Sequence, residues 1–261
     1  MSPIETILIT GASSGLGLAF LTHYLSLSTP TPKIVALDTH PLPERITTPH
    51  PPTLSFHRLD ITSASAVQTL ASTYAHTPIT LILHCAGIRG LVPSIVSREK
   101  DGTRNVASTE TLEVMDKETM MRTFEVNTWG TFNLIKSFLP SLLSSSASSL
   151  ENTSITRPKV VILSSRMSSI SANSAGGAYA YRASKAALNA VMRSFVIDVP
   201  QVQFLLLHPG RVETGLVAWK EEGAVSVEES VRDCLRVLER MREEEWASGR
   251  LVDRFGEEIG W

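Results

Sequence analysis

Tyr181 and Lys185 are the pair of residues in this chain whose types and spacing best suit proton transfer. They lie four positions apart, so a helix over 178–199 places both side chains on one face. A tyrosine hydroxyl has an ordinary pKa of ~10, which is too high for easy proton exchange at neutral pH. A nearby lysine ammonium favours the phenolate and lowers that pKa. The pair therefore indicates acid–base chemistry, although tyrosine and lysine also fall four apart by chance on solvated helices.

A glycine-rich turn near the start of the chain indicates the kind of ligand that accompanies this acid–base pair. Residues 7–10 form a short apolar run typical of a buried strand, and residues 16–21 begin a helical pattern. Gly11, Gly15 and Gly17 occupy the junction. Glycine lets a pyrophosphate approach the backbone, and the N–H groups and dipole of a helix start favour negative charge. The turn therefore predicts a dinucleotide-binding site.

We also compared the residues of this turn with the motifs of two other functions. Residues 11–15 also fit the G-x-S-x-G pattern of a hydrolase nucleophile elbow, but that elbow needs strands and an oxyanion loop upstream, and only ten residues precede Gly11. A phosphate-binding P-loop would end in Gly-Lys-Ser/Thr, and the turn holds no lysine. A glycine-rich connection without a ligand is the plainest alternative.

The composition indicates one ordinary globular domain over residues 1–261, with 43% hydrophobic and 19% charged residues. A net charge of −2 gives no electrostatic footprint for nucleic acid or an anionic membrane, and no apolar run approaches the ~20 residues that span a bilayer. Cys85 and Cys234 lack metal-ligand spacing and argue against a disulfide scaffold. With no signal segment before the first strand, we expect a cytoplasmic protein without a metal site.

Strands and helices alternate along the chain. Apolar runs predict strands at 7–10, 33–38, 54–60, 81–87, 159–164, 203–208 and 251–253. Longer periodic segments predict helices at 15–27, 63–74, 116–144, 178–199 and 227–246. Pro140 is expected to kink or end the third of these helices, and 39–52, 89–113 and 144–154 are expected to be loops. The alternation predicts an α/β fold, a doubly wound parallel sheet with helices on both faces.

Tyr181 and Lys185 follow the predicted strand 159–164 and its Ser164-Ser165 end, in a chain that opens with T-G-A-S-S-G-L-G. Together these features resemble the short-chain dehydrogenase/reductase family over essentially the whole chain. Residues 176–181 and 249–261 resemble its small carbonyl reductases. The resemblance implies a single Rossmann-type domain and an NAD(P)-dependent oxidoreductase, which moves a hydride between nicotinamide and the carbon of a carbonyl or alcohol.

The resemblance also implies catalytic roles for four residues. Tyr181 would be the acid/base, with Lys185 tuning its pKa and holding the nicotinamide ribose. Asn127 would hold a water that links Lys185 to solvent. Ser165, at the end of the predicted strand, would fix the substrate oxygen, whereas the shorter spacing to tyrosine usual in the family selects Ser168. We favour Ser165, because the sheet fixes the strand end while the following segment can hold an insertion.

The dinucleotide contacts implied by the resemblance lie in the glycine turn and at the ends of the predicted strands. They are Thr10, Gly11, Ser13, Ser14, Gly15, Leu16, Gly17, Asp38, Asp60, Ile61, Cys85, Ala86, Gly87, Asn127, Tyr181, Lys185, Pro209, Gly210, Val212 and Thr214. His84-Cys85 departs from the family's N-N-A-G turn, whose asparagines brace the sheet. Asp38 ends the second strand and would bond the ribose and repel a 2′-phosphate, so we predict NAD. NADP is the alternative, with His40 or Arg45 holding the phosphate.

A non-catalytic dinucleotide sensor or scaffold is the alternative function. The intact catalytic set favours the enzyme, because a sensor would be free to lose it. We expect a small-molecule carbonyl or alcohol substrate, with 89–105 and 212–222 as pocket walls, and no nucleic acid or membrane as partner. The resemblance leaves a homo-oligomer open. Tyr179 is expected to line the pocket, and His208 and Cys85 are expected to be packing groups.

Overall fold

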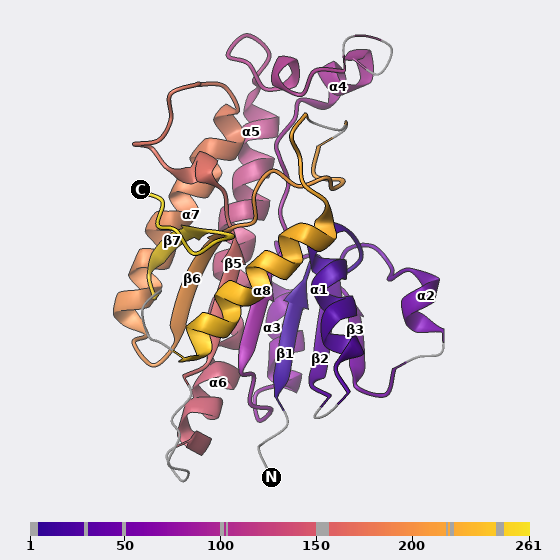
Figure 1. The fold of residues 1–261 in the computed structure, drawn as a ribbon, viewed down its shortest axis with the longest axis vertical. Helices are drawn as coiled ribbons and strands as arrows, with labels where there is room; N and C mark the ends of the chain where they lie inside the picture. Colours follow the sequence, from indigo (N-terminus) through magenta and orange to yellow (C-terminus); the bar gives the residue numbers. More distant parts are fainter. Residues whose placement is uncertain are drawn as a thin grey trace.

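The structure is a computed structural model that describes residues 5–28, 31–48, 51–99, 102, 104–149, 157–217, 219, 222–243 and 248–261. It contains a twisted sheet in the strand order β3-β2-β1-β4-β5-β6-β7, and every pairing in it is parallel (Figure 1). The strands are β1 (Thr6–Thr10), β2 (Lys33–Asp38), β3 (Leu54–Arg58), β4 (Leu81–His84), β5 (Lys159–Leu163), β6 (Gln203–His208) and β7 (Arg250–Asp253). The predicted doubly wound parallel sheet is confirmed.

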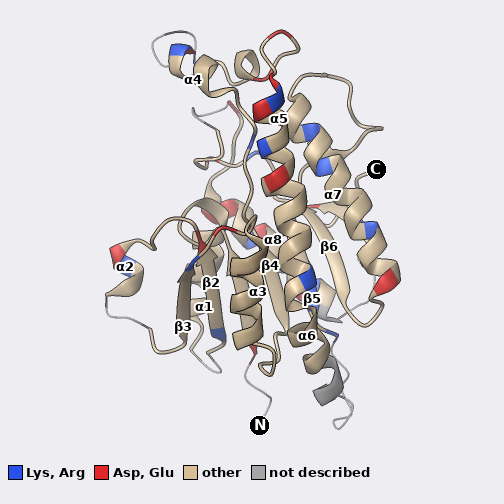
Figure 2. Ribbon diagram, turned by 180° about the vertical axis from the view of Figure 1, so that it is seen from behind, with Lys and Arg blue, Asp and Glu red and all other residues tan. Residues whose placement is uncertain are grey.

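Helices cover both faces of this sheet. They are α1 (Gly15–Ser26), α2 (Glu44–Thr47), α3 (Ala64–Thr73), α4 (Pro93–Glu99), α5 (Lys117–Phe124), α6 (Thr131–Ser149), α7 (Tyr179–Asp198) and α8 (Val227–Glu243). Three short turns of helix join them, namely η1 (Ala107–Thr109), the π-helical η2 (Glu125–Gly130) and η3 (Arg166–Ser168). Figure 1 shows α1 and α8 on one face, and Figure 2 shows α3, α6 and α7 on the other.

The core follows from the apolar composition of the central strands. In β1, the side chains of Ile7 and Ile9 join the cluster beneath α1 and α8, while Leu8 joins the cluster on the opposite face. All three are fully buried. A strand that is buried on both faces shows a continuous apolar run instead of an alternating pattern. This is why the strands of the sheet are easy to recognise in the sequence.

The structure divides the helix expected over 116–144 into separate elements. The Asp116 carboxylate caps α5 by accepting the Thr119 N–H at 2.7 Å, and the π-helical turn η2 then separates α5 from α6. Pro140 lies inside α6, which runs on to Ser149, so the helix does not end at Pro140 and the loop expected over 144–149 was wrong. Buried packing holds the helix through the proline, since Phe138 and Leu142 flank it in the core. Residues 150–156 of the expected loop lie outside the described residues.

Two segments expected to be loops contain short helices. The predicted loop 39–52 holds α2, and the predicted loop 89–113 holds α4 and η1. Short polar helices of this kind carry too few apolar residues for a periodic pattern to reveal them. In Figure 1, α4 lies beyond the ends of the strands that carry the loops of the site. Among the described residues no helix combines the length and apolar character needed to cross a bilayer.

Candidate active site

A cavity of about 340 Å³ opens at the carboxyl ends of β1 and β4, where the chain leaves neighbouring strands toward opposite faces of the sheet. Ligands of open α/β sheets bind at such a switch point. The cavity is lined by most of the predicted dinucleotide residues, namely Gly11, Ser14, Gly15, Leu16, Gly17, Asp38, Asp60, Ile61, Cys85, Ala86, Gly87, Tyr181, Lys185, Pro209 and Thr214. The remaining predicted residues, Thr10, Ser13, Asn127, Gly210 and Val212, lie outside this lining, and Val212 lines a neighbouring cavity.

The glycine turn brings the start of α1 against the end of β4. A Cβ added at Gly17 would lie 2.1 Å from the Gly11 carbonyl oxygen, and one at Gly11 would lie 2.9 Å from the Ala86 amide nitrogen. Gly11 also has a φ of +66°, which side chains disfavour. The turn therefore requires glycine at both positions. Its exposed backbone and the N-terminus of α1 together fit a pyrophosphate.

Asp38 lies at one end of the cavity, at the end of β2. Its carboxylate accepts the backbone N–H of Ser13 and that of His40, each at 2.9 Å. The His40 imidazole lies 3.6 Å from the same carboxylate, whereas Arg45 lines the neighbouring cavity. These bonds fix the acid beside the glycine turn, where an adenosine ribose would lie.

The serine that contacts Tyr181 is Ser165. The Ser165 hydroxyl lies near enough to the Tyr181 hydroxyl to oppose the rise of the tyrosine pKa. Ser168 is engaged elsewhere, because its hydroxyl donates to the Ser165 carbonyl at 2.6 Å and accepts from the Asn189 amide at 3.1 Å. The geometry therefore places Ser165, and not Ser168, beside the tyrosine.

Lys185 and Asn127 meet beside Gly87. A Cβ built on Gly87 would lie 3.2 Å from Asn127 Oδ1 and 3.7 Å from Lys185 Nζ, so the two polar groups approach one point from different elements. Lys185 Nζ donates to the Leu163 carbonyl at 2.9 Å, and burial lowers the pKa of this lysine to about 8. Asn127 lies in η2, where its Oδ1 accepts the Ile88 N–H and its Nδ2 donates to the Ile88 carbonyl.

The electrostatic surroundings of Tyr181 differ from the expectation. Burial raises the pKa of the Tyr181 hydroxyl, and the Arg89 guanidinium and the Ser165 hydroxyl oppose this rise. Arg89 lies 4.8 Å from the centre of the tyrosine ring, whereas Lys185 Nζ lies 5.9 Å from it. Arg89 was predicted only as the start of the pocket wall 89–105 and not as a neighbour of Tyr181; it follows the small-residue turn after β4 by two positions. Its position just after the end of a strand was the feature of the sequence that pointed to the site.

His84 takes up the bracing that the family's asparagines would supply. Thr10 Oγ1 accepts the N–H groups of Cys85 and Ala86, so its own hydrogen goes to His84 Nδ1 at 2.9 Å. His84 Nε2 therefore carries the ring proton and donates to Thr131 Oγ1 at 2.9 Å, which donates to the Asn127 carbonyl. This chain ties β1 and β4 to η2. Burial, and secondarily Lys185, lowers the pKa of His84 to about 3.

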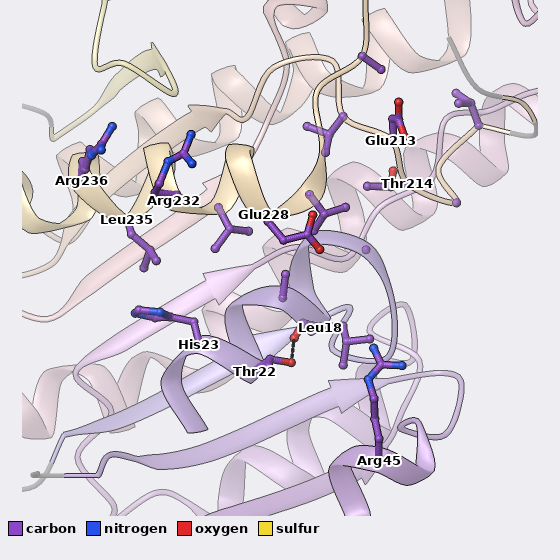
Figure 3. A pocket seen from close by; sticks show the side chains of 18 of the residues that line it. Leu18, Thr22, His23, Arg45, Glu213, Thr214, Glu228, Arg232, Leu235 and Arg236 are labelled. Carbon is purple, nitrogen blue, oxygen red and sulfur yellow. Dashed lines mark hydrogen bonds between the residues drawn. The ribbon is translucent and has the colours of Figure 1, made fainter. Parts of the chain in front are cut away.

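Two further cavities adjoin the site. One of about 870 Å³ lies beside Arg89, Glu110 and Tyr179 and reaches Glu222, so it touches both segments predicted as pocket walls. The other, of about 1130 Å³, lies between α1 and α8 and shares Gly15 with the dinucleotide cavity (Figure 3). Neither lining contains a member of the catalytic set, but the first cavity includes Arg89, which lies against the ring of Tyr181, so it is the better candidate for a substrate. Among the described residues, no group of three His, Cys, Asp or Glu side chains could hold a metal ion.

Comparisons with known proteins agree with this geometry. Residues 5–224 match the family model described as short chain dehydrogenase. The C-signal protein of Myxococcus xanthus is 37% identical over 149 residues, which are 56% of this chain and 81% of that protein. A 1-hydroxy-2-glutathionyl-2-methyl-3-butene dehydrogenase of Rhodococcus sp. (strain AD45) is 29% identical over 209 residues, 78% of each chain.

Solved structures show the same fold. The NADPH-bound carbonyl reductase from chicken fatty liver matches with a TM-score of 0.79 and 26% sequence identity, and the match covers 99% of both chains. The family match spans the glycine turn, the serine at the end of β5, and the tyrosine and lysine of α7. The chain is therefore a member of the short-chain dehydrogenase family.

Proposed function

We propose that this protein is an NAD(P)-dependent oxidoreductase that interconverts a carbonyl compound and an alcohol, with Tyr181 as the acid/base. The observation that carries the proposal is the placement of Tyr181 in the lining of the cavity at the glycine turn, beside Ser165 and one helical turn from Lys185. The constrained glycine turn and the switch-point cavity fit a nicotinamide dinucleotide, which when bound supplies or accepts the hydride.

The residues of this chain then handle the proton. In the reducing direction the substrate oxygen gains the Tyr181 hydroxyl proton as the carbonyl carbon gains the hydride. Ser165 donates a hydrogen bond to that oxygen and orients it. Lys185 returns a proton toward Tyr181 through the polar groups gathered beside Gly87, where Asn127 also points. In the oxidising direction each transfer runs backward.

Substitution of the tyrosine tests the proposal. Tyr181→Phe keeps the ring but removes the exchangeable proton, so turnover should fall by ~10²–10⁴-fold while dinucleotide affinity survives. Turnover is measured as loss of reduced cofactor absorbance with a panel of ketones and aldehydes, and affinity by fluorescence titration. Tyr74→Phe is the matched control, because its hydroxyl bonds His57 instead of the site.

A sensor or scaffold would give a different result. It would bind the dinucleotide but turn over none of the panel. A Tyr181→Phe variant that retained most of the wild-type turnover would remove Tyr181 from the mechanism.

A further inference from the structure

A buried ion pair lies against the ring of Tyr181. Arg89 Nε donates to Glu110 Oε2 at 2.9 Å, and Arg89 Nη2 donates to Glu110 Oε1 at 2.7 Å. The side chains of Arg89 and Glu110 are only 13% and 6% exposed. The guanidinium carbon lies 4.8 Å from the centre of the Tyr181 ring. A bidentate pair of this kind has a fixed geometry, because the planar fork of arginine matches the carboxylate.

The backbone fixes both members of the pair relative to Tyr181. Gly90 follows Arg89 with a φ of +77°, and a Cβ there would lie 2.5 Å from Thr123 Oγ1, so the arginine stands on a tightly packed turn. The Glu110 carbonyl accepts the Ala178 N–H at 3.0 Å, at the residue that precedes α7. Glu110 thus holds the start of the tyrosine's helix through its backbone and Arg89 through its side chain.

We propose that Arg89 and Glu110 are positioning residues that act on Tyr181 electrostatically, the cation stabilising its phenolate and the carboxylate limiting that effect. This proposal rests on the proposed function, in which Tyr181 exchanges the proton. Glu110 occupies two of the three guanidinium nitrogens, and the guanidinium carbon lies 4.8 Å from the centre of the ring. That arrangement suits control of the tyrosine better than capture of a substrate anion.

The other charges near Tyr181 come from its own helix. Lys185 Nζ lies 5.9 Å from the centre of the ring. Arg182 is adjacent to Tyr181 in sequence and interacts electrostatically with both Arg89 and Glu110. Arg166, on η3, pairs with Asp253 instead. Among these groups Arg89 and Glu110 are the two whose substitution changes the charge at Tyr181 without altering α7.

Opposite substitutions in the pair test the proposal. Arg89→Met removes the cation, so the pKa that limits kcat/KM for alcohol oxidation should rise by about 1–3 pH units. Glu110→Gln leaves the arginine without its carboxylate partner, so the same pKa should fall. The double variant Arg89→Met, Glu110→Gln has no charged pair and keeps the test available where the lone Glu110 carboxylate prevents folding. The pKa that limits kcat/KM in the double variant should lie above the corresponding pKa in Glu110→Gln.

A second readout does not depend on turnover. Protein labelled at the hydroxyl-bearing ring carbon of tyrosine is titrated by NMR, and Tyr181 is assigned by comparison with Tyr181→Phe. Its pKa should be displaced upward by Arg89→Met and downward by Glu110→Gln. The proposal is overturned if the Tyr181 pKa moves in the same direction in both variants, or moves in neither. If Tyr181→Phe keeps its turnover while the NMR pKa moves as expected, the proposed function fails and the electrostatic control stands.

Discussion

Asp38 is the residue that we expect to decide which dinucleotide the cavity prefers. Its carboxylate is held beside the glycine turn by two backbone N–H groups, so it cannot swing away from a 2′-phosphate without losing both bonds. The chicken carbonyl reductase is NADPH-bound, whereas the fixed acid in this chain favours a free ribose hydroxyl.

We therefore expect kcat/KM to be at least ~10-fold higher with NADH than with NADPH, which corresponds to about 1.4 kcal/mol of discrimination. Asp38→Ser should move the ratio toward NADPH by a similar factor. Asp60→Asn is the control, because Asp60 lies elsewhere in the cavity and should affect both cofactors alike. A wild-type preference for NADPH would contradict the assignment of Asp38.

At the scale of elements, the glycine turn has no room for a side chain. Gly17→Ala places a methyl group against the Gly11 carbonyl, which is backbone and cannot move aside cheaply. We expect a loss of ~1–3 kcal/mol or more in the free energy of unfolding, and weaker dinucleotide binding. Thermal unfolding and fluorescence titration measure the two effects.

Gly215→Ala serves as the control for this substitution. Gly215 lines the same cavity, but a Cβ there meets nothing within 4 Å. Its stability should stay near that of the wild type. Equal stability of the two alanine variants would mean that the close approach of α1 to the Gly11 backbone is not required.

The elements also show where sequence patterns succeed and fail. The bounds of β2 and β6 were predicted correctly, because apolar runs end there at polar or turn residues. The π-helical turn was missed, since one extra residue in a helical turn barely disturbs an apolar periodicity. The Arg89–Glu110 pair was missed for another reason. Its members lie 21 positions apart, and only the folded path of the intervening short helices brings them together.

At the scale of the whole molecule, His84 couples the sheet to the helical layer and makes stability depend on pH. Its pKa is about 3 in the folded protein, below the ordinary value of 6.5. As the pH falls below ~6.5, the unfolded chain binds a proton at His84 that the folded protein does not bind. Stability should therefore be lost in acid, by up to ~1.4 kcal/mol per pH unit from this group, down to a pH near the folded pKa.

His84→Asn separates this effect from other titrations. It should be less stable than the wild type at neutral pH by ~1–3 kcal/mol, because the bridge from Thr10 to Thr131 is broken. The difference in stability should shrink on acidification, since asparagine does not titrate. His208 is present in both proteins, so its titration does not contribute to this difference. Urea unfolding near pH 7 and near pH 5 measures it. Parallel stability profiles for the two proteins would show that His84 does not set the acid response.

The segment between Ser169 and Ala178 bears on how this protein can be altered. Ser169 is tied to the Gly260 carbonyl at one end, and Ala178 is tied to Glu110 at the other. Between these ties, a Cβ built on Gly176 or Gly177 would meet nothing within 4 Å. We therefore expect Ser165 and Tyr181 to keep their positions when the length of this interval changes. Exchange of the segment for others of different length and composition should then alter the substrate range while the proposed catalytic residues stay in place.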